Sequence, residues 1–132
     1  LDARETSGRA EVRIAACLPP LVASYRADVQ PDPPDARRSY ERIVACQREL
    51  ADLMLCETMS TVQEACIAAE AALASGLPVW VALTIEDRSN DPSVPRLRGG
   101  ETLQRAIGTL EALGIDALLL NCSSPEAISA AW

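Results

Sequence analysis

Apolar residues in this chain fall into two kinds of pattern, short continuous runs and longer stretches with helical spacing. The short runs predict strands over residues 12–17, 53–56, 78–85 and 117–120. The longer stretches predict helices that begin near residues 36, 60, 101 and 124. A polar or Gly/Pro-containing loop separates each predicted strand from the helix after it. The pattern therefore predicts a strand–helix unit that is repeated four times.

Capping signals mark several of the predicted helix ends. Ser60, followed by Gln63, predicts a capping box at the start of the second helix. Gly114 is expected to close the third helix, because glycine readily adopts the left-handed conformation that ends a helix. Ser124 before Pro125 predicts a serine N-cap and a proline in the first turn of the last helix.

The predicted strands are apolar throughout rather than alternating, which is typical of strands that are covered on both faces. Such strands, joined by helices, predict an α/β fold with one parallel sheet. The loops that follow the strands then gather at one edge of the sheet, where α/β proteins carry their chemistry. Helices on one side alone would leave the other face bare. We therefore expect either helices that cross over or further barrel strands outside this chain.

Composition and charge narrow the function classes. The chain has 132 residues, of which 48% are hydrophobic and 23% charged, so it forms one folded domain or one piece of a larger one. Its net charge of −7 argues against a nucleic-acid or anionic-membrane partner. No apolar run approaches the roughly 20 residues that span a bilayer, and residues 1–7 do not resemble a signal peptide, so we expect a cytoplasmic protein. Histidine is absent, which leaves carboxylates, thiols or a thiol-bound metal for any catalysis.

Candidate chemistry lies at three of the predicted strand ends. Cys17 ends the first strand, Glu57 follows Cys56 at the end of the second, and Asn121 and Cys122 follow the fourth. If Glu57 faces the mouth of the sheet, side-chain alternation turns Cys56 toward the helices. For Cys122, the alternative to a metal ligand is a small buried hydrophobe. For Glu57, the alternative to a base or an amine ligand is a solvated carboxylate.

The remaining cysteines and a glycine pair have simpler explanations. Cys46 and Cys66 are predicted to pack in the core. Five cysteines without a Cys-x-x-Cys pair predict reduced thiols rather than a disulfide framework. Gly99 and Gly100 before a helix are typical of a phosphate-binding loop or of a hinge, and no Walker-type lysine accompanies them.

Five stretches in order along the chain resemble the homocysteine S-methyltransferase family. They are residues 18–26, 52–59, 76–81, 97–101 and 120–127. The resemblance implies a (β/α)8 TIM barrel, of which residues 1–132 are a partial domain with strands three to six. It also implies a zinc ion held by three cysteines. One of these matches Cys122, while the other two, adjacent in the family, have no counterpart in this chain. The resemblance further implies that Glu57 and Asn121 bind the substrate, with Glu57 at the amino group of homocysteine.

The implied reaction needs no histidine. A free thiol with a pKa of about 8.5 is a poor nucleophile at neutral pH, and zinc deprotonates a coordinated thiol. Three thiolates leave the fourth tetrahedral position for the homocysteine sulfur. That sulfur attacks the methyl group of a small donor such as S-methylmethionine, S-adenosylmethionine or betaine, and methionine forms. Because one thiolate cannot hold catalytic zinc, we expect the chain alone to be inactive and its intact parent to be active.

Two other functions stay open. A non-catalytic half-barrel that serves as a binding or assembly module would pair as a homo-oligomer, bind homocysteine weakly and bind no zinc. A phosphate-binding barrel fragment that uses Gly99 and Gly100 would be protected by phosphate esters and indifferent to chelators.

Overall fold

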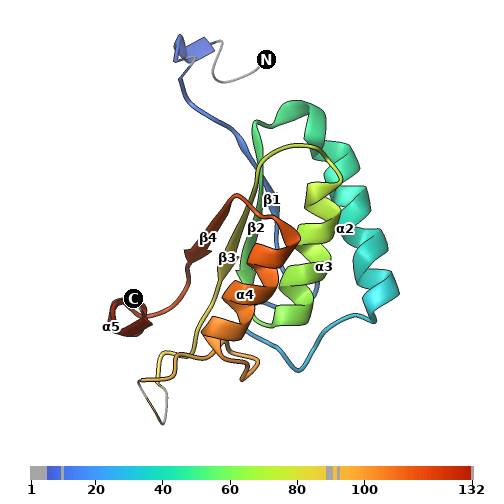
Figure 1. The fold of residues 1–132 in the computed structure, drawn as a ribbon. Helices are drawn as coiled ribbons and strands as arrows, with labels where there is room; N and C mark the ends of the chain where they lie inside the picture. The colour runs from blue at the N-terminus through green and yellow to red at the C-terminus, as the bar shows by residue number, and fades with distance from the viewer. Residues whose placement is uncertain (1–5, 10, 89–90, 92, 132) are drawn as a thin grey trace.

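The computed structural model describes residues 6–9, 11–88, 91 and 93–131. Four parallel strands form one sheet in the order β1-β2-β3-β4 (Figure 1). The strands are β1 (Ala15–Leu18), β2 (Leu53–Met59), β3 (Val79–Leu83) and β4 (Ala117–Leu120). The helices are α2 (Pro33–Gln47), the 3₁₀ turn η1 (Arg48–Leu50), α3 (Val62–Leu73), α4 (Leu103–Leu113) and α5 (Pro125–Ala131). The predicted α/β fold with a parallel sheet is confirmed.

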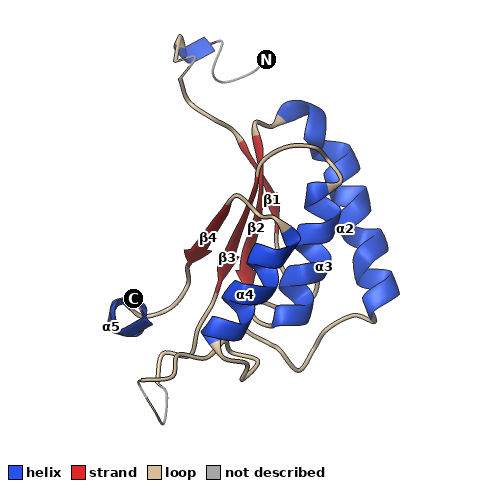
Figure 2. Ribbon diagram, in the orientation of Figure 1, coloured by secondary structure: helices blue, strands red, loops and turns tan. Residues whose placement is uncertain are grey.

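Helices α2, α3 and α4 lie side by side on one face of the sheet (Figure 2). The strand residues that point toward them are fully buried, among them Leu18, Met54, Cys56, Val81 and Leu83. The register aligns these positions, because Leu18 pairs with Cys56 and Cys56 pairs with Val81. Among the residues that the structure describes, no helix covers the opposite face. Of the two arrangements expected from the sequence, helices that cross over to the other face are not found in the described ranges, and further barrel strands outside this chain stay the prediction.

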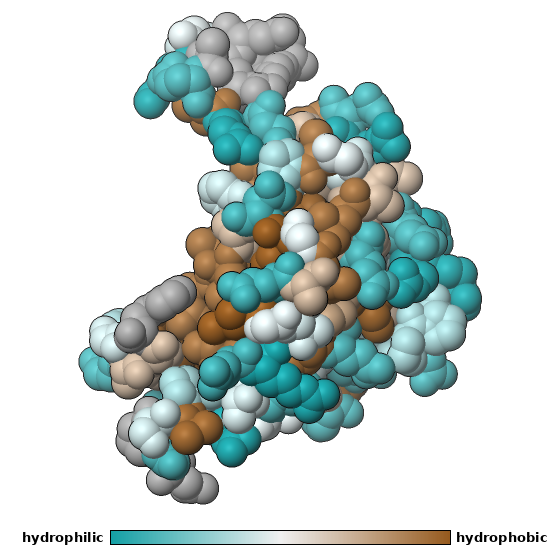
Figure 3. Space-filling model, in the orientation of Figure 1, coloured by the Kyte–Doolittle hydropathy of each residue, from teal (hydrophilic) through white to brown (hydrophobic). Residues whose placement is uncertain are grey.

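The sheet ends at β4 with no further strand in the described part of the chain. All four residues of β4 are only half-buried. Figure 3 shows apolar side chains gathered at the centre of the view, over the strands, with hydrophilic side chains around them. An unpaired strand edge next to an apolar sheet face is what remains when a section of a closed barrel is considered by itself.

Three of the four strands differ from their predicted bounds, and among them β3 is Val79–Leu83 rather than residues 78–85. β1 begins at Ala15 rather than residue 12, and β2 continues through Glu57 and Thr58 to Met59. The polar residues Glu57 and Thr58 indicated a loop, but the register between β2 and β3 shifts there, and Thr58 adopts a left-handed φ of 62°. β2 therefore stays in the sheet while its side-chain alternation is broken at Thr58.

The predicted capping box at Ser60 and Gln63 is wrong by one residue. Thr61 is the N-cap of α3, and its hydroxyl accepts a hydrogen bond from the Glu64 amide at 3.0 Å. The Glu64 carboxylate in turn accepts from the Ser60 amide at 2.8 Å. Threonine with glutamate three residues on satisfies the capping box better than serine with glutamine, because the carboxylate also interacts favourably with the helix dipole.

The other caps are as predicted. Gly114 follows α4 in the left-handed conformation, with φ of 84°. Ser124 precedes Pro125, the first residue of α5, and its hydroxyl accepts from the Ala127 amide at 3.2 Å. The first predicted helix begins at Pro33 instead of residue 36, because proline is well tolerated in a first helical turn.

The cysteines that were predicted to pack in the core behave differently from one another. Cys66 is partly buried against the core, as predicted. Cys46 is exposed, so that prediction is wrong. Cys46 lies about 200° around α2 from the buried Val44, on the solvent side. All five cysteines are free thiols. No helix in the described ranges has both the length and the apolar character needed to cross a membrane.

Candidate functional site

Cys17 and Glu57 meet on the face of the sheet that carries no helices. Cys17 pairs with Leu55 in the register, and Glu57, two positions further along β2, shares that face. The Cys17 thiol donates a hydrogen bond to Oε1 of Glu57 at 2.6 Å. Burial, together with the neighbouring Glu57 carboxylate, raises the pKa of the Cys17 thiol to about 12. Cys17 is therefore a neutral hydrogen-bond donor to Glu57 and not a thiolate ligand.

Cys56 points the other way, as alternation predicts. It is 0% exposed and belongs to the core under the helices. Burial raises the pKa of its thiol to about 12. Glu57 is half-buried on the open face and has Cys17 as its partner, so neither a fully solvated carboxylate nor joint action with Cys56 describes it.

Asn121 and Cys122 come directly after β4 and reach the end of β2. The Nδ2 group of Asn121 donates to Oγ1 of Thr58 at 3.0 Å, and that oxygen lies 3.7 Å from the Cys122 sulfur. Because β3 lies between β2 and β4, these side chains meet across the end of β3. Cys122 is exposed, so the alternative of a small buried hydrophobe is wrong.

Asn121 also carries a polar atom without a partner. Its Oδ1 is buried and accepts no hydrogen bond from the residues that the structure describes. A buried acceptor left unpaired costs about 1–3 kcal/mol, so such an atom is an expected contact point for a ligand that donates a hydrogen bond. Thr58, which fixes the other end of the Asn121 amide, is the residue after Glu57. The structure thus places the three predicted site residues, Glu57, Asn121 and Cys122, at the ends of β2 and β4, with β3 between them.

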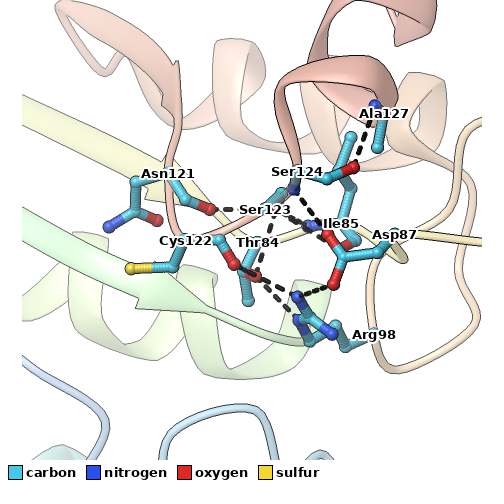
Figure 4. Close-up of polar contacts among 9 residues, drawn as sticks. All are labelled: Thr84, Ile85, Asp87, Arg98, Asn121, Cys122, Ser123, Ser124 and Ala127. Atoms are coloured by element: carbon cyan, nitrogen blue, oxygen red, sulfur yellow. Dashed lines mark hydrogen bonds and ion pairs between the residues drawn. The ribbon is translucent and has the colours of Figure 1, made fainter.

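Residues 121–124 form a turn after β4, and a hydrogen-bond network around Arg98 holds this turn in place (Figure 4). Arg98 Nε donates to Oγ1 of Thr84 at 2.9 Å, and Nη2 donates to the Cys122 carbonyl at 3.1 Å. Nη2 also pairs with Oδ2 of Asp87 at 2.9 Å. The other oxygen of Asp87 accepts from the Ser124 amide at 2.5 Å. The Ser124 amide, followed by Arg98, holds the pKa of Asp87 below its usual value.

Ser123 ties the same turn to the end of β3. Its hydroxyl accepts a hydrogen bond from the Ile85 amide at 2.9 Å and donates one to the Asn121 carbonyl at 3.0 Å. The Asn121 amide donates to the Leu83 carbonyl at 3.1 Å. The chain on both sides of Cys122 is therefore held to β3, independently of the cysteine side chain.

Tyr25 reaches the site from the long loop between β1 and α2. Its backbone is left-handed, with φ of 67°, and the residue is 48% exposed. The Arg98 guanidinium lies over this ring, 5.1 Å from its centroid. A hydrogen bond with the Cys122 side chain raises the pKa of the Tyr25 hydroxyl. The sequence patterns missed Tyr25, Thr58 and Arg98, although all three lie inside stretches that carry the family resemblance.

Gly99 and Gly100 do not form a phosphate cradle. Their amides already donate within the protein, from Gly99 to the Ser60 carbonyl at 2.9 Å and from Gly100 to the Leu97 carbonyl at 2.8 Å. A Cβ atom on Gly99 would lie 2.7 Å from Cγ2 of Thr61. Close packing of this loop against the start of α3 explains the glycine at position 99.

The side chains present fit one ligand of a zinc site but not a complete one. Among the described residues, no group of three or more cysteine or carboxylate side chains is arranged to hold a metal ion. Cys122 carries an exposed thiol at the strand ends, whereas the Cys17 thiol is engaged by Glu57. Any complete thiolate site that includes Cys122 requires ligands beyond the described residues.

Comparisons with known proteins agree with this architecture. A sequence model of the homocysteine S-methyltransferase family matches residues 2–132. Among solved structures, the apo form of the homocysteine methyltransferase MmuM from Escherichia coli superposes with a TM-score of 0.65 at 22% identity. The match covers 96% of this chain and 45% of that one, so the chain spans less than half of the neighbour's length. No curated protein matches the sequence. The likeness to MmuM confirms the predicted fold, part of a TIM barrel.

Proposed function

The chain belongs to the homocysteine S-methyltransferase family, and from this premise we propose that it forms the substrate-binding part of an S-methyltransferase barrel. The parent protein transfers a methyl group to the thiol of homocysteine and produces methionine. The observation that carries this proposal is the strand-end cluster. There the exposed thiol of Cys122 follows Asn121 with its unpaired Oδ1, and the Glu57 carboxylate lies near the end of β2, with β3 between them.

Glu57 and Asn121 bind the amino group of homocysteine in this proposal. Both offer oxygen acceptors, and a substrate ammonium is a donor that both can share. The Cys17 thiol occupies Oε1 of Glu57 and leaves Oε2 for the ligand. A hydrogen bond to a charged group contributes about 1.5–3 kcal/mol, enough to favour an aminothiol over a plain thiol.

Cys122 is the one zinc ligand that this chain supplies, and the other two cysteines come from the parent protein beyond residue 132. When bound, zinc supplies a Lewis acid that keeps a coordinated thiol deprotonated at neutral pH. The chain's own residues hold the Cys122 turn, orient the Asn121 amide through Thr58 and bind the substrate amine. The chain alone is therefore inactive. The methyl donor, such as S-methylmethionine, S-adenosylmethionine or betaine, contacts segments outside it.

The direct test uses the longer protein, which is expected to contain the complete barrel. The coding sequence that continues past Trp132 is expected to encode two adjacent cysteines. The protein expressed from it should form methionine from homocysteine with one of the three donors, and a zinc chelator should abolish this activity. Cys122→Ser should remove both zinc and activity, while Cys46→Ser, at an exposed position on α2, should change neither. An intact zinc-containing protein that methylates no thiol would contradict the proposal.

The substrate contacts can be tested separately with a matched pair of ligands. Homocysteine and 4-mercaptobutanoate differ by the amino group alone. In the intact protein, Glu57→Gln should weaken homocysteine binding about tenfold, which corresponds to about 1.4 kcal/mol, and leave 4-mercaptobutanoate unaffected. Glu49→Gln, at an exposed carboxylate in η1, is the control. Equal losses for the two ligands would remove Glu57 from amine recognition.

The unpaired edge of β4 favours a second candidate, an assembly module in which two copies close one sheet. Such a chain forms a stable homo-oligomer at micromolar concentration and binds no zinc. Sedimentation equilibrium of the 132-residue chain distinguishes the two functions when it is combined with the coding sequence. A stable dimer together with a stop codon after Trp132 favours the module. A monomer with an in-frame continuation favours the enzyme.

A further inference from the structure

Arg98 lies behind the turn that presents Cys122, on the side away from the thiol (Figure 4). We propose that Arg98 is a positioning residue: through its hydrogen bond to the Cys122 carbonyl, it keeps the Cys122 thiol and the Asn121 amide on the same side of the chain. The use of that thiol as a zinc ligand rests on the proposed function. The conformational role of Arg98 does not.

The backbone of Cys122 explains why such support is needed. In an extended chain, neighbouring side chains point to opposite faces, so Asn121 and Cys122 would diverge. Cys122 instead has a left-handed φ of 50°. Figure 4 shows the Asn121 and Cys122 side chains on one side and the Cys122 carbonyl turned toward Arg98. The left-handed conformation is disfavoured for residues with a Cβ atom, so contacts outside the cysteine must hold it.

Those contacts converge on one carbonyl oxygen. The Cys122 carbonyl accepts from Nη2 of Arg98 at 3.1 Å and from Oγ1 of Thr84 at 3.3 Å. Thr84 is 0% exposed, and the Arg98 side chain is 23% exposed, so water has little access to replace either donor. If the turn relaxed, the carbonyl would rotate away from both groups, and the Cys122 thiol would move with it.

Arg98 is itself fixed by contacts to two stretches of the chain, the segment after β3 and the loop after β1. Its Nε donates to Thr84 at the end of β3, and Nη2 pairs with Asp87 in the following loop. Its guanidinium plane also lies over the ring of Tyr25, from the loop after β1. Lysine offers neither a planar fork nor a stacking surface, so it cannot make these contacts together. Arginine at this position therefore connects two loops to the carbonyl of Cys122.

The side-chain amide of Asn121 reports on this arrangement. Its Nδ2 donates to Thr58, so its paired ¹⁵N–¹H signals depend on where the turn holds the side chain. The signals are assigned by comparison with Asn121→Asp. The second readout is hydrogen exchange at the Asn121 and Ser124 backbone amides, which donate to Leu83 and Asp87. Both measurements use the 132-residue chain and need no metal.

Arg98→Ala should shift the Asn121 side-chain signals and speed exchange at Asn121 and Ser124 about tenfold, the equivalent of one lost hydrogen bond to a charged group. Arg98→Lys should fall closer to the alanine variant than to the parent chain. Arg96→Ala is the matched control, because Arg96 also donates to a carbonyl in this loop, that of Gly100 at 2.7 Å. It should leave both readouts unchanged.

Chemical rescue separates positioning from general packing. Free guanidinium, far below the concentrations that unfold proteins, should restore the Asn121 signals in Arg98→Ala, while ammonium at equal ionic strength should not. If Arg98→Ala unfolds, Asp87→Asn, which removes the ion pair but keeps the side-chain volume, should shift the Asn121 side-chain signals in the same direction by a smaller amount.

Two results would overturn the inference. One is an Arg98→Ala chain that cannot be distinguished from Arg96→Ala in both readouts, and the other is full restoration by lysine. Neither result depends on methyl transfer. An intact parent without methyltransferase activity would refute the proposed function and leave the Asn121 measurement standing. An active parent in which Arg98→Ala has no effect on the two readouts would refute the role of Arg98 and leave the proposed function standing.

Discussion

The helix-covered face of the sheet and the strand-end edge differ in backbone and in chemistry. On the covered face, α3 packs through fully buried alanines at positions 65, 68, 69 and 72. At the edge, Tyr25, Thr58 and Cys122 adopt positive φ, and they are the only non-glycine residues with positive φ in the described ranges. These three residues also contact one another or share Arg98. Backbone strain is therefore concentrated where the candidate site residues meet.

This difference suggests a division of roles within one small sheet. Regular backbone and close packing on the covered face stabilise the fold. The strained edge, with its unpaired Asn121 oxygen, lowers the stability in exchange for a defined arrangement of polar groups. Substitutions on the two sides should accordingly have opposite consequences for the free energy of unfolding.

The largest effect is expected in the core under the helices. Leu83→Ala should lower the free energy of unfolding by about 3 kcal/mol, because Leu83 is 0% exposed and its removal leaves a cavity. Leu50→Ala is the matched control, since Leu50 is 73% exposed in η1, and its effect should stay within about 0.5 kcal/mol. Urea unfolding followed by circular dichroism measures both. Equal midpoints for the two variants would remove the distinction between the covered face and the surface.

A pair of glycines probes the junction between core and edge. Gly99→Ala should cost about 1–3 kcal/mol, because its Cβ would lie 2.7 Å from Thr61 Cγ2 and 3.0 Å from the Ser60 backbone oxygen. Gly108→Ala, inside α4 with nothing within 4 Å of the new Cβ, should instead stabilise the chain by about 1 kcal/mol. Thermal unfolding of both variants gives the two signs. A neutral Gly99→Ala would mean that the loop is free to move.

Much of the fold could be predicted from sequence because its signals are local. Gly114 and Ser124 mark helix ends through conformations that involve only neighbouring residues. The strand at 117–120 was correct to the residue. The capping box was displaced because Ser60 and Thr61 both suit an N-cap, and the choice depends on Glu64, which reaches back to the Ser60 amide.

The site was only partly predictable, for a different reason. Glu57 and Cys122 follow apolar runs, so they could be identified as strand-end candidates. Tyr25 and Arg98 lie in loops, and their contact is created by the way the sheet brings those loops together. Side-chain alternation correctly predicted the orientation of Cys56. It fails two residues later, at Thr58, because that residue has a left-handed backbone. Local patterns do not encode that interruption.

A smaller effect is expected from strain at the edge itself. Cys122→Gly and Cys122→Ala both remove the thiol, but only alanine retains the Cβ atom that opposes a φ of 50°. The glycine variant should be more stable than the alanine variant by about 1 kcal/mol, the reverse of the order at ordinary positions. Chemical unfolding of the pair, with Cys46→Gly and Cys46→Ala in α2 as the reference, measures the difference. The same sign at both positions would mean that the turn is unstrained.

The smallest effect on stability, and the sharpest test of the open face, concerns Cys17. Because burial and the Glu57 carboxylate raise its thiol pKa to about 12, Cys17 should react with a neutral alkylating reagent at least about tenfold more slowly than the exposed Cys46 near pH 8.5. Glu57→Gln removes one cause of the raised pKa and should speed the reaction at Cys17 alone. Peptide mapping by mass spectrometry gives the rate at each cysteine.

The same raised pKa has a defined sign for stability. The folded chain holds the Cys17 proton more tightly than the unfolded chain, so this contribution is present below the ordinary thiol pKa and is lost as pH rises toward about 12. Cys17→Ser should therefore show a shallower loss of stability above about pH 9 than the parent chain. Equal slopes, together with rapid alkylation of Cys17, would show that its thiol does not hold Glu57. The Glu57 carboxylate would then need another partner to fix it.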